Sequence, residues 1–524
     1  CSFLSCLDFF SQDESERPFG YFFPLLNYQK INLFSLSILY SSSRYYKNNS
    51  IDSKSLAYLF NLLRDSVYMD YNAKNDLLHV KPLTSYFIKQ ANTQFLYQNY
   101  NILAIASRNL DLYYNLPKIH NECIKRKVRS HFIDIPNSFL LHLDISIKDF
   151  IIIGCSLIDL YYEKYLQLNY DKIKENIANC NNYGNKQKWK LLSVFINESI
   201  GYRDNFYFSP REFHNGNKYY DIKQIEIFLN IVAKTSKELS CMQSRPPYNN
   251  GNITQRLCVL NRYPVIKENC EKYILPNIRT YIYSFSNLVH LLLQEKYPNN
   301  EFNDTYGRIF EIFVREMTKD LLPNHIIIPE TRYRKSKNHV DGPDLIIIDK
   351  LEKSIIAIEI KSKNVKLGSR KEPFSRECVR DFEDIFKALK KLPDKIDDLY
   401  CEFDEYNQWN EIINCIPKSN CMCIVIMGKG LYLMPEVINQ LKQTEEGSFL
   451  NSYPYPYCII RNEIFEQMLE LANEKKSSLS QILKNYWKDS LNESAKENNA
   501  ENLRNMVPDN FNKYLCKKLI SLFS

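Results

Sequence analysis

The chain has 524 residues, of which 44% are hydrophobic and 25% charged, and its mean hydropathy is −0.40. This composition is typical of a folded protein of several domains, and it excludes a disordered chain and a membrane-embedded one. The formal net charge of +7 allows a polyanionic partner but does not require one, because binding depends on where the basic residues cluster. Glycine is scarce, with 12 residues, which favours a helix-rich architecture.

The cysteines and the first residues bear on the cellular compartment. The 15 cysteines are irregularly spaced and include no CxxC pair, which argues against a disulfide scaffold or a zinc ribbon and for reduced thiols. The first residues lack a basic segment and soon turn acidic, unlike a secretory signal. The longest uncharged apolar stretch, 150–158, is too short to cross a bilayer. We therefore expect a cytoplasmic protein without membrane association; the first residue is not Met, so an earlier start stays open.

Residues 1–300 have mostly helical periodicity, and a division into two subdomains near 145–220 fits their pattern. A proline after Ser209 and a glutamate at position 212 form a helix start signal. The segment 244–257 is a loop by its Pro, Asn and Gly content. The expected helices are 55–69, a long helix from 147, one starting at 209–212, 221–240 and 278–296.

From about residue 301 the pattern changes to a compact α/β order, and we place a domain at 301–475 and a polar helical tail at 476–524. Residues 335–342 are expected to form a turn. The remaining expected elements are, in order, helix 304–322, strand 326–334, strand 344–349, strand 354–361, helix 372–392, strand 421–428, a strand and helix within 456–473, and an amphipathic piece at 511–523.

Two of these strands carry charged residues at their ends. Asp344 starts one, and Glu359-Ile360-Lys361 ends the next. Because side chains alternate along a strand, Glu359 and Lys361 lie on one face. Unpaired charge on apolar strands is costly, so these residues are expected to act together. The alternative is a surface hairpin in which Asp344 caps a strand and Lys361 is solvated.

The order α–β–β–β–α–β, with Pro343-Asp344 on the second strand and Glu359-Ile360-Lys361 on the third, resembles the PD-(D/E)xK nuclease superfamily. This resemblance implies a restriction-endonuclease-like α/β fold, a mixed central sheet flanked by helices. It also implies that Asp344 and Glu359 hold Mg²⁺ or Mn²⁺, with the Ile360 carbonyl as a further ligand. Lys361 would position or activate water, and Glu311, on the preceding helix, would support a second metal or a water. Carboxylate and carbonyl oxygens suit these metals.

A group of basic residues follows the third strand and is a weak candidate for phosphate contacts. Interspersed acidic residues make an ordinary solvated helix face an equal alternative. The candidates are Lys363, Arg370, Lys371, Arg376 and Arg380.

These observations predict a metal-dependent endonuclease that hydrolyses phosphodiester bonds, with DNA expected over RNA. The alternative is a catalytically silent nucleic-acid-binding or scaffolding protein that retains the nuclease fold. Residues 1–300 would recognise substrate, regulate, bind a partner protein or build a homo-oligomer. The layout is similar to that of antiviral or restriction-type effectors of bacteria.

Overall fold

A computed structural model describes residues 102–128, 131–166, 207–216, 220–245, 259–276, 278–297, 300–335, 338–364, 376–401, 404–429, 441–475, 477–491 and 513–521. The described residues form two compact units. The helical unit contains 102–110 and the described parts of 135–296, and the sheet unit contains 111–134 and the described parts of 297–521. The division near residue 296 lies close to the domain boundary drawn from the sequence, while 111–134 joins the sheet unit without a signal in the sequence. The helix expected at 55–69 lies outside the described residues.

The helical unit is built around aromatic side chains on two long helices, α9 (Ile147–Leu166) and α15 (Ile278–Lys296). Gly154 lets α9 approach α15 closely, because a Cβ there would lie 2.1 Å from the ring of Phe285. The Tyr281 hydroxyl donates a hydrogen bond to the Gly154 carbonyl at 2.7 Å. The expected start at Ser209 is present, and its hydroxyl accepts from the Glu212 amide. The other helices of this unit are α6 (Ile102–Leu110), α8 (Ile135–Leu143), α12 (Pro210–Gly216), α13 (Ile222–Val232) and α14 (Ser236–Gln243).

The helix expected at 221–240 is interrupted, which corrects the prediction. A short strand, β2 (Ala233–Thr235), separates α13 from α14. Thr235 and Glu238 form a capping box that starts α14, a signal that the apolar periodicity concealed. β2 belongs to a four-stranded sheet of order β1-β4-β3-β2, which the sequence did not indicate; its other strands are β1 (Tyr207–Phe208), β3 (Val265–Lys267) and β4 (Tyr273–Ile274).

The sheet unit is organised by a five-stranded mixed sheet of order β11-β10-β9-β8-β5. β5, β8 and β9 are antiparallel, whereas β9, β10 and β11 run parallel. The coarse prediction of an α/β domain with a mixed sheet and flanking helices is therefore confirmed. The strands are β5 (Ile326–Pro329), β8 (Leu345–Asp349), β9 (Ser354–Asn364), β10 (Cys421–Lys429) and β11 (Tyr457–Arg461).

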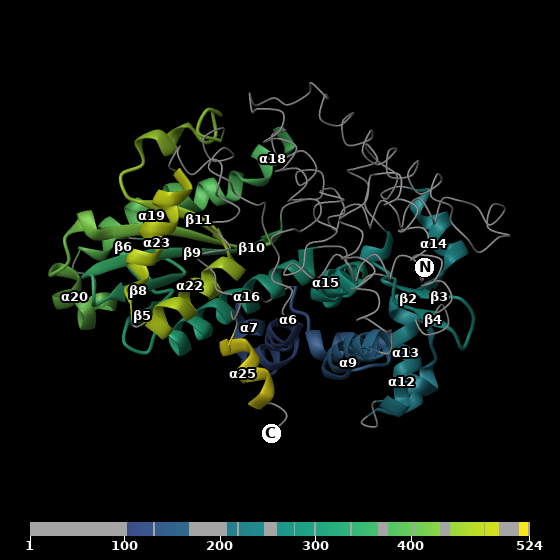
Figure 1. The fold of residues 1–524 in the computed structure, drawn as a ribbon. Coiled ribbons are helices and arrows are strands. Elements are labelled where there is room, and N and C mark those ends of the chain that lie inside the picture. Colours follow the sequence, from purple (N-terminus) through teal and green to yellow (C-terminus); the bar gives the residue numbers. More distant parts are fainter. Residues whose placement is uncertain are drawn as a thin grey trace, which may run out of the picture. The chain divides into compact units, whose positions relative to one another are not determined.

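Alternating side chains give the sheet two buried faces. Ile346, Ile348, Ile355 and Ala357 join one apolar core together with α19 (Glu383–Leu399). The opposite face is packed by α16 (Asn300–Leu321), which contacts β9 and β5. Figure 1 shows the sheet with helices α16 and α22 (Asn462–Lys475) on one side and α19 on the other. The order of helix, three antiparallel strands, helix and parallel strand is thus the one expected from the sequence.

Three details of this unit differ from the sequence prediction. The strand expected at 326–334 is two strands, because the chain leaves the sheet after Pro329 and continues as β6 (Arg332–Lys335). β6 pairs with β7 (Asn338–Asp341), within the segment expected to be a turn. The helix expected at 372–392 is divided into α18 (Arg376–Asp381) and α19.

The remaining elements surround the sheet unit. Asp349, at the end of β8, is buried and accepts hydrogen bonds from Ser478 and Ser480, which fastens the start of α23 (Leu479–Leu491) to the sheet. The amphipathic piece near the C-terminus is helical, as α25 (Lys513–Ser521), and Lys518 pairs with the buried Asp111 at 2.7 Å. The other helices are η1 (Asp111–Asn115), α7 (Leu116–Lys127) and α20 (Asn407–Asn414), with short 3-10 turns at 404–406, 418–420 and 448–452. None of the described helices combines the length and apolar character that a bilayer crossing requires.

Candidate active site

The start of β8 and the end of β9 bring the predicted acidic residues together. The antiparallel register pairs Leu345 with Ile358, so Asp344 lies beside the charged end of β9. The Asp344 carboxylate accepts a hydrogen bond of 2.6 Å from the Ile360 amide, which fixes its orientation. The Ile360 side chain is buried in the opposite face of the sheet, which leaves only its carbonyl as a candidate ligand.

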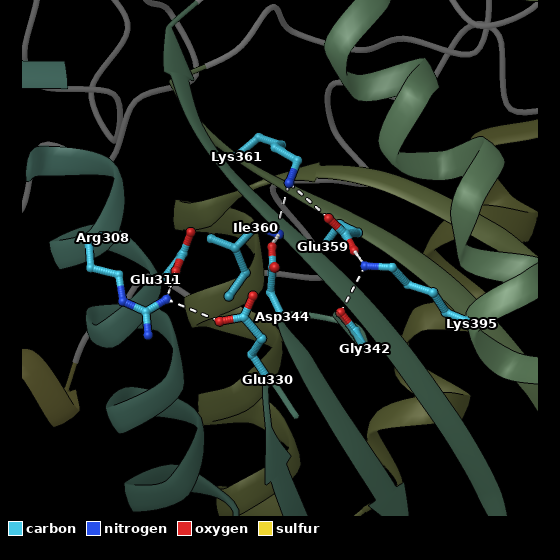
Figure 2. A network of polar contacts seen from close by, with 9 residues as sticks. All are labelled: Arg308, Glu311, Glu330, Gly342, Asp344, Glu359, Ile360, Lys361 and Lys395. Atoms are coloured by element: carbon cyan, nitrogen blue, oxygen red, sulfur yellow. Dashed lines mark hydrogen bonds and ion pairs between the residues drawn. The ribbon is translucent and has the colours of Figure 1, made fainter. Parts of the chain in front are cut away.

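Lys361 connects the two carboxylates. Its Nζ lies 2.8 Å from Glu359 Oε2 and 3.6 Å from Asp344 Oδ2. The Glu359 and Asp344 side chains are 6% and 12% exposed, so both are partly removed from water. All three residues that the sequence singled out therefore point to one place, as Figure 2 shows. The alternative, a surface hairpin, predicted a solvated Lys361. In the structure Lys361 is paired with the carboxylates of both Glu359 and Asp344.

A second lysine, Lys395 on α19, pairs with the other carboxylate oxygen of Glu359. Its Nζ donates to Glu359 Oε1 at 2.5 Å and to the Gly342 carbonyl at 2.8 Å. Sequence reasoning missed Lys395 because it ended the helix before Pro393, a residue that disfavours helix interiors by about 3 kcal/mol. The apolar stripe continues beyond it with the buried Ile396 and Leu399, whose burial against the sheet offsets that cost. The continuing spacing of these apolar residues was the available signal.

Glu311 reaches the site from α16, as expected. It forms an ion pair with Arg308, one turn earlier on the same helix. Arg308 also lies 3.4 Å from Glu330 Oε2, and Lys127 on α7 lies 3.8 Å from that same oxygen. Figure 2 shows Asp344 between the Glu311 and Glu330 side and the Glu359 side of the network. Glu330, which follows β5, and Arg308 carry no motif and were not predicted.

Burial and neighbouring charges shift the pKa values of the carboxyl groups at this site. Burial, followed by the charge of Asp344, raises the pKa of Glu311 to about 7. Burial and the charge of Glu359 raise the pKa of Asp344 to about 6. Burial acts the same way on Glu359, but Lys361 and Lys395 outweigh it and lower its pKa. Burial is the first cause of both raised values, and Arg308 acts in the opposite direction on Glu311. An added cation beside these carboxyl groups would favour their ionised forms.

The donor chemistry fits a hard divalent metal ion. Carboxylates from Glu311, Asp344 and Glu359 and the Ile360 carbonyl would hold Mg²⁺ or Mn²⁺. Within the described part of the chain, no group of three His, Cys, Asp or Glu side chains is already arranged to hold a metal ion. At this site the ammonium of Lys361 lies within 3.6 Å of the carboxylates of both Asp344 and Glu359. Metal binding would therefore require these side chains to rearrange.

The predicted phosphate-binding residues are only partly described. Arg380 is exposed on α18. The side chains of Lys363 and Arg376 lie outside the described residues, as do Arg370 and Lys371 entirely. Their role in nucleic-acid binding stays a prediction.

Comparison with protein-family models, with curated proteins and with solved structures gives no match. The function of this chain is therefore inferred from its own residues and their geometry.

Proposed function

We propose that this chain is a metal-dependent nuclease that hydrolyses phosphodiester bonds. One observation carries the proposal: the carboxylates of Asp344 and Glu359, from two adjoining strands, both lie within 3.6 Å of the ammonium nitrogen of Lys361. Two features support it. Glu311 approaches from the preceding helix, and burial, followed by the charge of Asp344, raises its pKa. The strand and helix order around the site matches the order that resembles the PD-(D/E)xK superfamily.

The residues have distinct roles in this proposal. Asp344 and Glu359 bind the metal ion through their carboxylates, with the Ile360 carbonyl beside them. A bound divalent ion supplies charge neutralisation at the phosphate and a more acidic water. The pKa of Lys361 is raised by Asp344 and Glu359 despite burial, so its Nζ keeps its proton and donates hydrogen bonds. It therefore orients the attacking water or a phosphate oxygen. Glu311 supports a second metal or a water.

The substrate and assembly follow from the same resemblance. We expect DNA rather than RNA as the substrate. Because a duplex has two strands, a homo-oligomer with two such sites would cut both. The biological role would be that of an antiviral or restriction-type effector, and the residues before the nuclease domain would choose the substrate or bind a partner protein.

Cleavage assays test the proposal directly. Purified protein is incubated with plasmid, linear duplex, single-stranded DNA and RNA, with Mg²⁺, with Mn²⁺ or with chelator. The wild type should cut only with metal, and Lys361→Ala should cut more slowly by about 10²-fold or more, as expected when an electrostatic donor is removed. Lys391→Ala, an exposed residue on α19, is the control and should cut like the wild type.

The same assay separates the alternative function. If the chain is instead a scaffolding or binding protein that retains the fold, the wild type should leave every substrate intact. The variants Asp344→Ala and Lys361→Ala should then bind nucleic acid as tightly as the wild type. Equal cleavage by wild type and Lys361→Ala would refute the assigned role of the lysine. The metal dependence of cleavage is the deciding result, because ion-pair networks also occur at sites without catalytic function.

A further inference from the structure

Glu359 is bonded to a different lysine at each of its two carboxylate oxygens. Lys361 donates to Oε2 at 2.8 Å and Lys395 donates to Oε1 at 2.5 Å (Figure 2). The two lysines come from different elements. Lys361 lies on strand β9, and Lys395 lies on helix α19, which packs on the same face of the sheet. The metal role assigned to Glu359 uses these same two oxygen atoms.

Lys395 is held more firmly than Lys361. Its side chain is 15% exposed, compared with 32% for Lys361. It also donates to the Gly342 carbonyl at 2.8 Å, and an amine has donors enough for both partners. The other contact of Lys361 is the Asp344 carboxylate at 3.6 Å, itself a proposed metal ligand, whereas the other contact of Lys395 is a backbone carbonyl.

The anchor is itself fixed in place. The Gly342 amide donates to the Thr331 carbonyl at 2.9 Å, which ties the segment before β8 to the segment after β5. A Cβ at Gly342 would lie 2.5 Å from the Tyr406 hydroxyl and 3.0 Å from the Thr331 carbonyl oxygen, so only glycine fits without a shift. The Gly342 carbonyl therefore keeps Lys395 near Glu359 even when the carboxylate is engaged elsewhere.

We propose that Lys395 is a positioning residue that competes with the divalent cation for Glu359 Oε1, so that metal loading requires Lys395 to release Glu359. The inference rests on the proposed function, since it assigns a role toward the same metal. Lys395 neutralises Glu359 and fixes its carboxylate while no metal is bound. It also weakens metal binding, because an ammonium within hydrogen-bonding distance repels a divalent ion and occupies a ligand lone pair.

Calorimetric titration with Mn²⁺ tests the competition without measuring cleavage. Lys395→Gln keeps a donor for Gly342 and removes the charge, so we expect it to bind Mn²⁺ about tenfold more tightly than the wild type, which is about 1.4 kcal/mol. Lys391→Gln removes the same charge one turn earlier on α19, at an exposed position, and should bind like the wild type. Affinity of Lys395→Gln equal to or weaker than wild type would overturn the competition, because a residue that only supported the fold would weaken binding when removed.

A second measurement uses the wild-type protein and avoids the risk that a variant fails to fold. Amines are acetylated briefly with and without Mn²⁺, and the modification at each lysine is measured by mass spectrometry. Release from Glu359 should increase acetylation of Lys395, while Lys391 should not change. Unchanged or reduced acetylation of Lys395 in the presence of bound Mn²⁺ contradicts the inference.

The outcomes separate the two proposals. Metal-dependent cleavage with no gain in Mn²⁺ affinity for Lys395→Gln refutes the competition alone. Absence of both Mn²⁺ binding and metal-dependent cleavage, in wild type and Lys395→Gln, refutes the proposed function and the competition together.

Discussion

Replacing Glu311 by Gln should make the protein's stability less dependent on pH. The pKa of Glu311 is raised to about 7, from an ordinary value of 4.5, by burial and by the charge of Asp344. Below about pH 4.5 the carboxyl is protonated in both the folded and the unfolded chain and contributes no difference. As the pH rises from about 4.5 to about 7, the unfolded chain ionises freely while ionisation in the folded protein is unfavourable. Stability is therefore lost over this window, and Gln imitates the protonated side chain.

The magnitude follows from the size of that shift. One pH unit corresponds to about 1.4 kcal/mol, which gives an upper value of about 3 kcal/mol for Glu311. The side chain is 30% exposed, so screening by solvent reduces the expected difference to about 1–2 kcal/mol. The pKa of Asp344 is raised to about 6, so Asp344 should add a smaller loss of stability with rising pH, in the same direction.

Urea unfolding of the metal-free protein at about pH 5 and about pH 8.5 measures the effect. Between these conditions the wild type should lose about 1–2 kcal/mol more free energy of unfolding than Glu311→Gln. Glu316→Gln, on the same helix and 36% exposed, is the control and should follow the wild type. Parallel curves for wild type and Glu311→Gln would refute the raised pKa of Glu311, and with it the burial and the nearby Asp344 charge that cause it.

Three further substitutions test the packing around the site and within the helical unit. Gly428→Ala places a Cβ 2.9 Å from a backbone oxygen of β9, beside the site, and should lower the free energy of unfolding by about 1–3 kcal/mol in urea titrations. Asp349→Asn removes an acceptor whose pKa is held low, despite burial, by hydrogen bonds from His325 and the serines that start α23. It should destabilise by about 2 kcal/mol at neutral pH, and the difference from wild type should shrink as the pH falls below about 4. Gly154→Ala places a Cβ 2.1 Å from the Phe285 ring and should increase amide hydrogen exchange in α9 and α15 but not in the sheet strands. Exchange in α9 and α15 equal to that of the wild type would contradict that packing.

The elements that sequence patterns predicted well are those whose burial follows a simple period. α15 matches its predicted range, and β8, β9 and β10 lie within a few residues of theirs. Their apolar residues repeat with a helical or a strand period, and that period is set by local backbone geometry. Where a local capping signal opposed the apolar periodicity, the prediction from periodicity was wrong. Thr235 caps a new helix, α14, within the segment 221–240 that was predicted to be one helix.

The candidate site shows the same limit. Glu359 and Lys361 share one strand, so alternation alone placed them on one face. Their partnership with Asp344 depended on the register of β8 with β9, which the sequence suggested only through a known resemblance. Arg308 and Glu330 belong to no motif, and only the fold brings them to Glu311.

By itself, the sequence determined that this chain has an α/β region with two apolar strands, one that begins at Asp344 and one that ends in Glu359 and Lys361. Those choices follow from local backbone periods and from the cost of placing charge on apolar strands. Only the tertiary structure decided that Lys395 takes the second oxygen of Glu359, because α19 continues through Pro393 to bury apolar residues against the sheet. Contacts between residues far apart in the chain depend on packing, and packing is a property of the whole fold rather than of any one segment.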